Sequence, residues 1–248
     1  MSFADLLIAA TAVLAATTLG GLAILLFKCP SQRARTILLS FAAGMMALSA
    51  AQMAYSAHQT AGNYVLLAGF ALGTFTLLVL EKFLPHLHLV LRKTHLEPSK
   101  QKVALIVGTI TIHNIPEGFA VASAFAAGGP LGWLVASSIA AQDVPEGFLV
   151  SAPLACYGVS VWRSIKFALL SGLVEFAAAV GGYLFLASAS WLAPWALAFS
   201  AGAMAYVILV ELLPDAFQKG FERTAATAFV SGAAAALVIE LLLAVPVP

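Results

Sequence analysis

The chain has 248 residues, of which 62% are hydrophobic and only 9% charged, and its mean hydropathy is +0.99. Because soluble domains carry about 25% charged residues, this composition excludes a soluble globular protein. The net charge of +1 gives no basic surface for nucleic acid. Two cysteines, Cys29 and Cys156, are too few for a disulfide framework and form no CxxC pair. The composition therefore predicts an all-α polytopic membrane protein.

Eight stretches of the chain are long and apolar enough to cross a bilayer, which requires about 20 residues each. They cover approximately residues 5–27, 36–54, 64–84, 103–126, 131–156, 164–188, 192–213 and 225–245. Asp5 stands where a secretory signal would have a basic residue, so we interpret the first stretch as a retained span. The longest loop, 85–102, is too short for a soluble domain, and we expect one transmembrane domain over residues 1–248.

The basic residues predict the orientation of these spans. All 12 Lys and Arg residues lie in or beside the first, third, fifth and seventh loops. They are Lys28, Arg33, Arg35, Lys82, Arg92, Lys93, Lys100, Lys102, Arg163, Lys166, Lys219 and Arg223. Since positive loops stay in the cytoplasm, the odd-numbered loops are expected inside and both termini outside.

The first three spans also resemble the last three. "LLSFAAGMM" at 38–46 is similar to "LAFSAGAMA" at 197–205, and "GFALGTFTLLVLE" ending at Glu81 is similar to "FVSGAAAALVIE" ending at Glu240. The offset is five spans, an odd number, so the two copies would cross the membrane in opposite directions. We therefore expect spans 1–3 and 6–8 to form an inverted repeat around spans 4–5, an arrangement typical of secondary transporters.

Two near-copies of one polar motif lie 29 residues apart in the fourth and fifth spans. "HNIPEGF" begins at His113 and "QDVPEGF" begins at Gln142. His113 is about ten residues into its span, so a rise of about 1.5 Å per residue puts it roughly 15 Å deep, near the midplane. A similar count puts Gln142, and Glu175 in the sixth span, at the same depth. Three neighbouring spans thus bring polar residues to one level of the membrane.

The spacing within each motif predicts two adjacent polar faces. His113 and Glu117 are four residues apart and share a helix face, as do Gln142 and Glu146. The next positions, rotated by about 100°, form the second face. They are Asn114 and Asp143. A proline in each motif removes a helical hydrogen bond, which is tolerated at this depth only where protein or a water-filled cavity satisfies the freed carbonyl.

Four carboxylates at this depth require compensation. They are Glu117, Asp143, Glu146 and Glu175. Each costs at least about 2.5–3.5 kcal/mol to place at the centre of a membrane helix, and no Lys or Arg lies at this level. A cation or protons must neutralise them. One His, four carboxylates and two amides are a nitrogen and oxygen ligand set suited to Zn²⁺, Fe²⁺, Mn²⁺ or Cd²⁺.

At these residues the chain resembles the Zrt-/Irt-like (ZIP) family of divalent-metal transporters, in its bacterial form. The resemblance rests on "HNIPEG", "QDVPEG", Glu175, and "AGAMAYVILVELLPDAF" at 201–217, and it extends over all eight spans. It implies a bacterial inner-membrane protein with both termini outside, often a homodimer, that moves metal into the cytoplasm by alternating access. Many members have "HExPHE" in the fifth span, where this chain has Gln142 in place of the first His.

The resemblance also implies a binuclear site. The first ion would be held by His113, Glu117, Gln142 and Glu146. The second would be held by Asn114, Asp143, Glu146 and Glu175. Glu146 would then bridge the two ions, and because Gln142 is a weaker ligand than His, the first site is expected to be less selective.

Further polar residues are candidates for a path toward or away from this site. They are Glu211, Asp215, Glu240, His86, His88 and His95. For the whole chain the leading hypothesis is a divalent-metal transporter, with Zn²⁺ as the expected substrate and no enzymatic activity. Two alternatives are an intramembrane di-metal enzyme and a metal sensor. The enzyme is disfavoured because no HExxH motif and no separate general base are present, and the sensor because no output domain is found.

Overall fold

The computed structural model describes residues 2–27, 29–82, 98–128 and 130–243, and within these ranges all regular structure is helical. The first half contains α1 (Phe3–Leu22), the 3-10 turn η1 (Ala23–Leu25), α2 (Gln32–Glu81) and α4 (Pro98–Ala127). The second half contains α5 (Leu131–Cys156), α6 (Val161–Ser188), the 3-10 turn η2 (Ser190–Leu192), α7 (Ala193–Val207), the π-helix η3 (Ile208–Leu212), α8 (Leu213–Ala216) and α9 (Glu222–Leu242). The prediction of an all-α protein is therefore confirmed.

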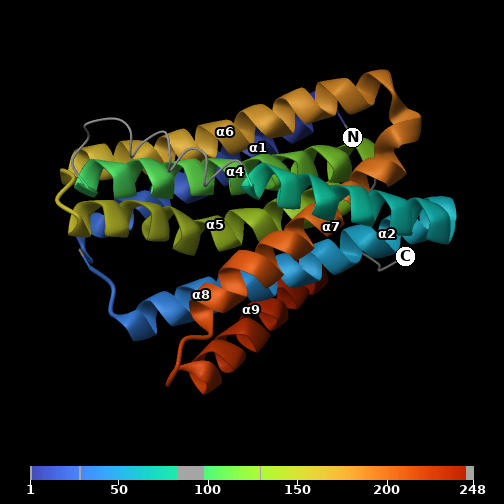
Figure 1. The fold of residues 1–248 in the computed structure, drawn as a ribbon. Coiled ribbons are helices and arrows are strands. Elements are labelled where there is room, and N and C mark those ends of the chain that lie inside the picture. The colour runs from blue at the N-terminus through green and yellow to red at the C-terminus, as the bar shows by residue number, and fades with distance from the viewer. Residues whose placement is uncertain (1, 28, 83–97, 129, 244–248) are drawn as a thin grey trace.

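By length and hydropathy, five helical segments among the described residues could cross a membrane. One of them, α2, has 50 residues and would be about 75 Å long if straight, more than twice the thickness of a bilayer core. It bends at Gly62, whose φ of 79° lies in the left-handed region that favours glycine. The windows predicted at 36–54 and 64–84 fall on either side of this bend. Figure 1 shows the second half of α2, in teal, turning back toward the other end of the molecule.

The helices form two groups. In one group α1 packs against α5 and α6, and α4 packs against α5 and α6; in the other, α2 packs against α7 and α9. The groups meet where α4 contacts α7 and α2 contacts α5. In Figure 1 they form two layers that converge on the right and diverge on the left, and the two marked chain ends lie on the right.

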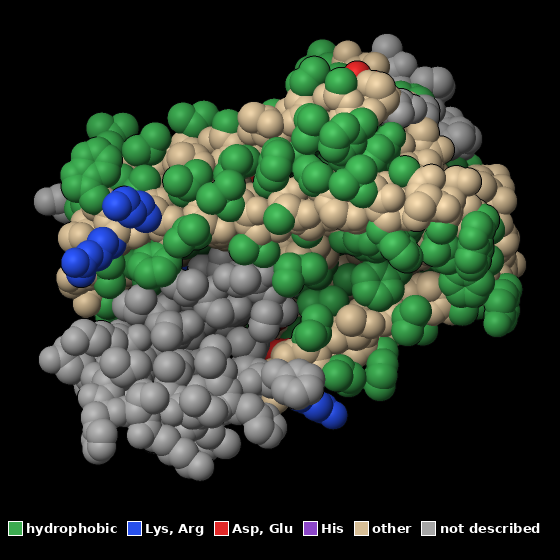
Figure 2. Space-filling model, turned by 90° about the horizontal axis from the view of Figure 1, so that it is seen from above, with side chains coloured by type: hydrophobic (Ala, Val, Ile, Leu, Met, Phe, Trp, Pro, Cys, Tyr) green, Lys and Arg blue, Asp and Glu red, His purple; other side chains and the backbone are tan. Residues whose placement is uncertain are grey.

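Exposed apolar side chains and basic side chains occupy different parts of the surface. Large apolar side chains such as Leu26, Trp162 and Leu241 are exposed. On the face seen in Figure 2, hydrophobic side chains are spread over the described surface, and Lys and Arg lie at the left end and the lower edge. Extensive exposure of large apolar side chains is favourable against another apolar phase, which agrees with a membrane protein.

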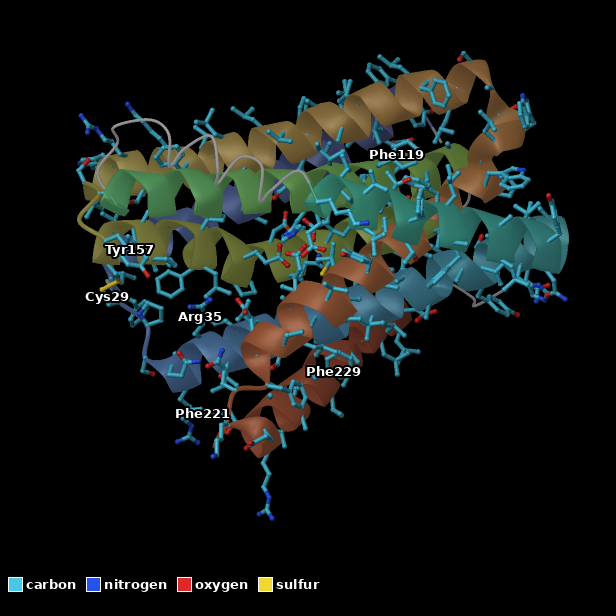
Figure 3. The ribbon with its side chains drawn as sticks, in the orientation of Figure 1. Cys29, Arg35, Phe119, Tyr157, Phe221 and Phe229 are labelled. Atoms are coloured by element: carbon cyan, nitrogen blue, oxygen red, sulfur yellow. A yellow bond between two sulfur atoms is a disulfide. The ribbon has the colours of Figure 1, made fainter. Side chains whose placement is uncertain are left out.

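A disulfide joins Cys29 to Cys156, with a Cα–Cα distance of 6.0 Å. Composition alone indicated only that no disulfide framework exists, and it gave no reason to pair these two residues across 127 positions. The bond ties the segment between η1 and α2 to the last residue of α5, and Figure 3 shows Cys29 beside Tyr157 at the left end. The disulfide therefore fastens the connection between the two helix groups to one of them.

Candidate metal centre

Three helices bring the predicted residues together near their midpoints. The first motif lies in α4, the second in α5, and Glu175 in α6, with Pro116 and Pro145 inside the first two helices. Glycines allow the helix backbones to touch here. A Cβ on Gly118 would lie 2.1 Å from the carbonyl oxygen of Glu175, and one on Gly147 would lie 2.0 Å from the carbonyl oxygen of Thr17. The motif glycines thus allow α4 to approach α6 closely and α5 to approach α1 closely.

The core of the site is a carboxylate cluster formed by Glu117, Asp143 and Glu146. One oxygen from each of these residues lies within 4.8 Å of the others. Glu117 and Asp143 are almost fully buried, at 2% and 1% exposure. Gln142, which is also buried, donates a hydrogen bond from Nε2 to Oε1 of Glu117 at 3.1 Å. The structure therefore brings together residues of both motifs across α4 and α5.

Several oxygens of this site have no hydrogen-bond partner. They are Oε2 of Glu117, Oε1 of Gln142, Oδ1 of Asp143, Oε1 of Glu146 and both carboxylate oxygens of Glu175. Each buried acceptor without a partner costs about 1–3 kcal/mol. Such an excess of oxygen acceptors without donors is the chemistry that a divalent cation satisfies, and this donor set fits Zn²⁺ or a similar ion.

A second group of contacts surrounds Asp143. The side chain of Glu175 lies near those of Asp143 and Asn114. Its carboxylate also interacts electrostatically with the carboxylates of Glu117 and Glu146. Ser171 on α6 donates a hydrogen bond to Oδ1 of Asn114 at 3.1 Å. Thr17 on α1 donates to Oδ2 of Asp143 at 2.9 Å. These are the second-face residues predicted from the sequence, and α1 and α6 supply hydroxyl groups to them.

His113 is oriented differently from the carboxylates. Its Nε2 contacts Oε2 of Glu211, and both side chains are only slightly exposed. Glu211 lies in η3, a π-helical turn between α7 and α8. Single π-turns inside helices are frequent at functional sites because they redirect a side chain. In this conformation His113 thus connects the motif of α4 with a candidate path residue of the other helix group.

The remaining path candidates lie toward the two ends of the molecule. Asp215 is 60% exposed and forms an ion pair with Arg35 at 3.1 Å. Glu240 accepts a hydrogen bond from Gln52 at 2.6 Å and is only 4% exposed, so it does not extend into the surroundings. Gln52 and Glu240 line a cavity of about 610 Å³. Three candidates fall outside the described residues: His86, His88 and His95.

Sequence reasoning missed the two hydroxyl side chains at the site. Thr17 and Ser171 lie on helices whose sequences look like ordinary apolar spans. A weak signal was available, because the adjacent pair Gly20 and Gly21 marks a place where another helix can approach α1 closely. Which residue of α5 stands opposite Thr17 depends on the packing of two helices separated by more than 100 residues of chain.

The sequence of the chain is similar to those of known zinc transporters. The family model described as ZIP Zinc transporter matches residues 90–240. Zinc transporter GufA of Myxococcus xanthus is 43% identical over 178 residues, which is 71% of this chain and 70% of that protein. Zinc transporter ZIPB of Bordetella bronchiseptica is 34% identical over 240 residues, 91% of this chain and 77% of that protein. Zinc transporter ZupT of Stenotrophomonas maltophilia is 33% identical and covers 84% of each chain. With the family model spanning more than half of its residues, the chain belongs to the ZIP family of transporters.

Proposed function

We propose that this protein carries Zn²⁺ into the cytoplasm through a binuclear site at the middle of the membrane. The observation that supports this most strongly is the carboxylate cluster of Glu117, Asp143 and Glu146, in which each residue has one buried oxygen without a hydrogen-bond partner. As a member of a family of divalent-metal transporters, the chain is not an enzyme, and the alternative of an intramembrane di-metal enzyme is set aside. The relatives named above are zinc transporters, which favours Zn²⁺ over Fe²⁺, Mn²⁺ and Cd²⁺.

The two ions would use the two faces of the paired motifs. The first ion takes His113, Glu117, Gln142 and Glu146 as ligands. The second ion takes Asn114, Asp143, Glu146 and Glu175. Glu146 bridges them, a role that suits its membership of one cluster with Glu117, a ligand of the first ion, and Asp143, a ligand of the second. The negative charge that these residues bring into the membrane is then balanced by the cargo itself.

The path candidates suggest how the ion reaches and leaves this site. The cavity beside Gln52 and Glu240 serves as the outer vestibule, where a buried carboxylate attracts a cation. On the inner side Glu211 contacts His113, so an ion leaving the first site meets a carboxylate next to its histidine ligand. Asp215, His86, His88 and His95 would then bind the ion on the cytoplasmic side.

Transport by alternating access would use the two helix groups. All seven proposed ligands lie on α4, α5 and α6, in the group that also contains α1. Movement of this group past α2, α7 and α9 would carry the ions between the outer and inner sides. We further propose eight spans with both termini outside, an inner-membrane location and a homodimer, on the basis of the hydropathy windows, the basic loops and the family.

Zinc influx into proteoliposomes tests the proposal. We would compare wild type with Glu146→Ala and with Glu222→Ala, a glutamate of the first turn of α9 that bonds to the backbone N–H of Gly220 outside the site. Saturable influx should be lost in Glu146→Ala and retained in Glu222→Ala. Unchanged influx in Glu146→Ala would show that Glu146 is not the bridging ligand. Absence of influx in folded wild-type protein, with an inward zinc gradient, would refute transport in this direction.

A further inference from the structure

Thr17 is the one residue of α1 whose side chain is hydrogen-bonded to a proposed ligand in the described structure. Its Oγ1 lies 2.9 Å from Oδ2 of Asp143 and 3.1 Å from the carbonyl oxygen of Val13. A hydroxyl has a single proton to donate, and a carboxylate is the stronger acceptor of the two. The Thr17 proton is therefore directed at Asp143. The side chain is 2% exposed, so water does not compete for this bond.

Close packing fixes Thr17 in this place. A Cβ on Gly20 would lie 2.1 Å from the carbonyl oxygen of Val144, and one on Gly147 would lie 2.0 Å from the carbonyl oxygen of Thr17 itself. Backbones of α1 and α5 are thus in contact immediately around the hydrogen bond. On the other side, a Cβ on Gly172 of α6 would lie 3.3 Å from Oγ1 of Thr17. The hydroxyl is enclosed by two helices and has little freedom to turn away.

The two oxygens of Asp143 consequently have different roles. Oδ2 accepts the Thr17 hydrogen bond, while Oδ1 is buried without a partner. With one oxygen held, rotation of the carboxylate about its χ2 angle is restricted, and Oδ1 remains available to an ion. Hydrogen-bonded partners behind a ligand typically change metal affinity by about 10–100-fold when removed.

We propose that Thr17 is a positioning residue for the second metal ion: its hydroxyl holds the carboxylate of Asp143 so that Oδ1 faces the ion. The inference rests on the proposed function, because it requires an ion at Asp143. It assigns to α1 a part in metal binding, although α1 contributes no ligand. Thr17 acts through Asp143 and does not itself contact the ion.

Zinc binding to the purified full-length protein in detergent tests this role. Titration against a competing zinc chromophore gives the affinity of each ion in wild type, Thr17→Val, Thr17→Ser and Thr18→Val. Valine has the shape of threonine without the hydroxyl, and serine keeps the hydroxyl. Thr18 is the matched control, because its hydroxyl donates to the carbonyl oxygen of Leu14 within α1 and not to the site.

We expect Thr17→Val to weaken the second ion by about 10–100-fold and to leave the first ion unchanged. Thr17→Ser should restore wild-type binding, and Thr18→Val should not alter it. Second-ion affinity equal to wild type in a folded Thr17→Val protein would overturn the proposal and leave Thr17 with a packing role. If the valine variant is not monodisperse, Thr17→Ala, which removes the hydroxyl without added bulk, decides by the same criterion.

The same titration separates this inference from the proposed function. Glu146→Ala is included, and if it binds zinc like wild type, the binuclear site itself is wrong whatever Thr17 does. If Glu146→Ala loses zinc and Thr17→Val does not, only the positioning role fails. Zinc influx adds a further readout, because loss of positioning should raise KM for zinc at an unchanged protein melting temperature.

Discussion

Gly118→Ala is a demanding test of how tightly the site depends on helix separation. The added Cβ would lie 2.1 Å from the carbonyl oxygen of Glu175 and 2.9 Å from Cβ of Ala178. Ordinary van der Waals contact begins at 3.4 Å, so α4 and α6 must separate by about 1.3 Å (3.4 minus 2.1). Both obstacles are on α6, and the first is backbone, so no flexible side chain can relieve the overlap.

The displacement acts on function more than on folding. Ligands must be held within about 0.5 Å of their productive positions. A shift of about 1.3 Å in α6 would move Glu175 away from Asn114 and Asp143 by more than this tolerance of about 0.5 Å. Overpacking of a core typically costs about 1–3 kcal/mol, which a folded membrane protein can withstand. We therefore expect a loss of zinc influx of about 10-fold or more, together with a modest decrease in Tm.

Gly181→Ala is the control, since a Cβ on this glycine of α6 meets no atom within 4 Å. Both variants would be reconstituted at equal protein density, and zinc influx and thermal stability measured in parallel. Wild-type influx and Tm in Gly118→Ala would show that α4 and α6 are not in close contact, and the derivation of the site from this packing would be refuted. A large decrease in Tm for both variants would indicate a general intolerance of α4 and α6 instead.

Two other predictions concern the proposed outer vestibule and the proposed orientation in the membrane. Glu240→Gln keeps an acceptor for Gln52 but removes the charge from the vestibule; we expect KM for zinc to rise roughly tenfold at low salt with an unchanged maximal rate. An unchanged KM would exclude Glu240 from the entrance. Disulfides are rare in the cytoplasm, yet the basic loops predict that side for Cys29 and Cys156. Intact cells would be treated with a reductant and then with a maleimide, neither of which crosses the membrane. We expect neither cysteine to be labelled, and labelling would show that the orientation is opposite to the proposed one.

The contact between His113 and Glu211 links a proposed ligand of the first ion to the proposed inner half of the path. His113 is a proposed ligand of the first ion, yet its Nε2 is directed at a carboxylate on the opposite helix group. An ion bound to His113 would displace this contact, and its departure toward Glu211 would restore it. The π-turn at Ile208–Leu212 is what brings Glu211 to that position, because regular α-helical geometry would turn the side chain by a different angle.

Much of the site could be predicted from the sequence because charge in a membrane is so costly. The paired motifs contain carboxylates where hydrocarbon would surround them, so a cation site is the economical explanation. Their four-residue spacing places partners on one helix face whatever the tertiary fold. Hydropathy likewise predicts helices, since only helices and closed barrels satisfy their own backbone in lipid.

Other features depend on contacts between distant segments and could be decided only by the tertiary structure. Hydropathy gave Glu240 a place near a helix end, but packing of α9 against α2 buries it beside Gln52. The pairing of Cys29 with Cys156 likewise depends on where the end of α5 lies relative to the start of α2.

The hydroxyl of Thr17 illustrates the division most clearly. Local sequence determined that α1 is an apolar helix containing two adjacent threonines, Thr17 and Thr18. Only the contact of α1 with α5 directs the first of them to Asp143, while the second bonds within its own helix. The sequence by itself thus determined the helices and the types of candidate ligand, through the cost of burying polar groups in lipid. The tertiary structure decided which side chains support those ligands, because that depends on how closely the helices pack.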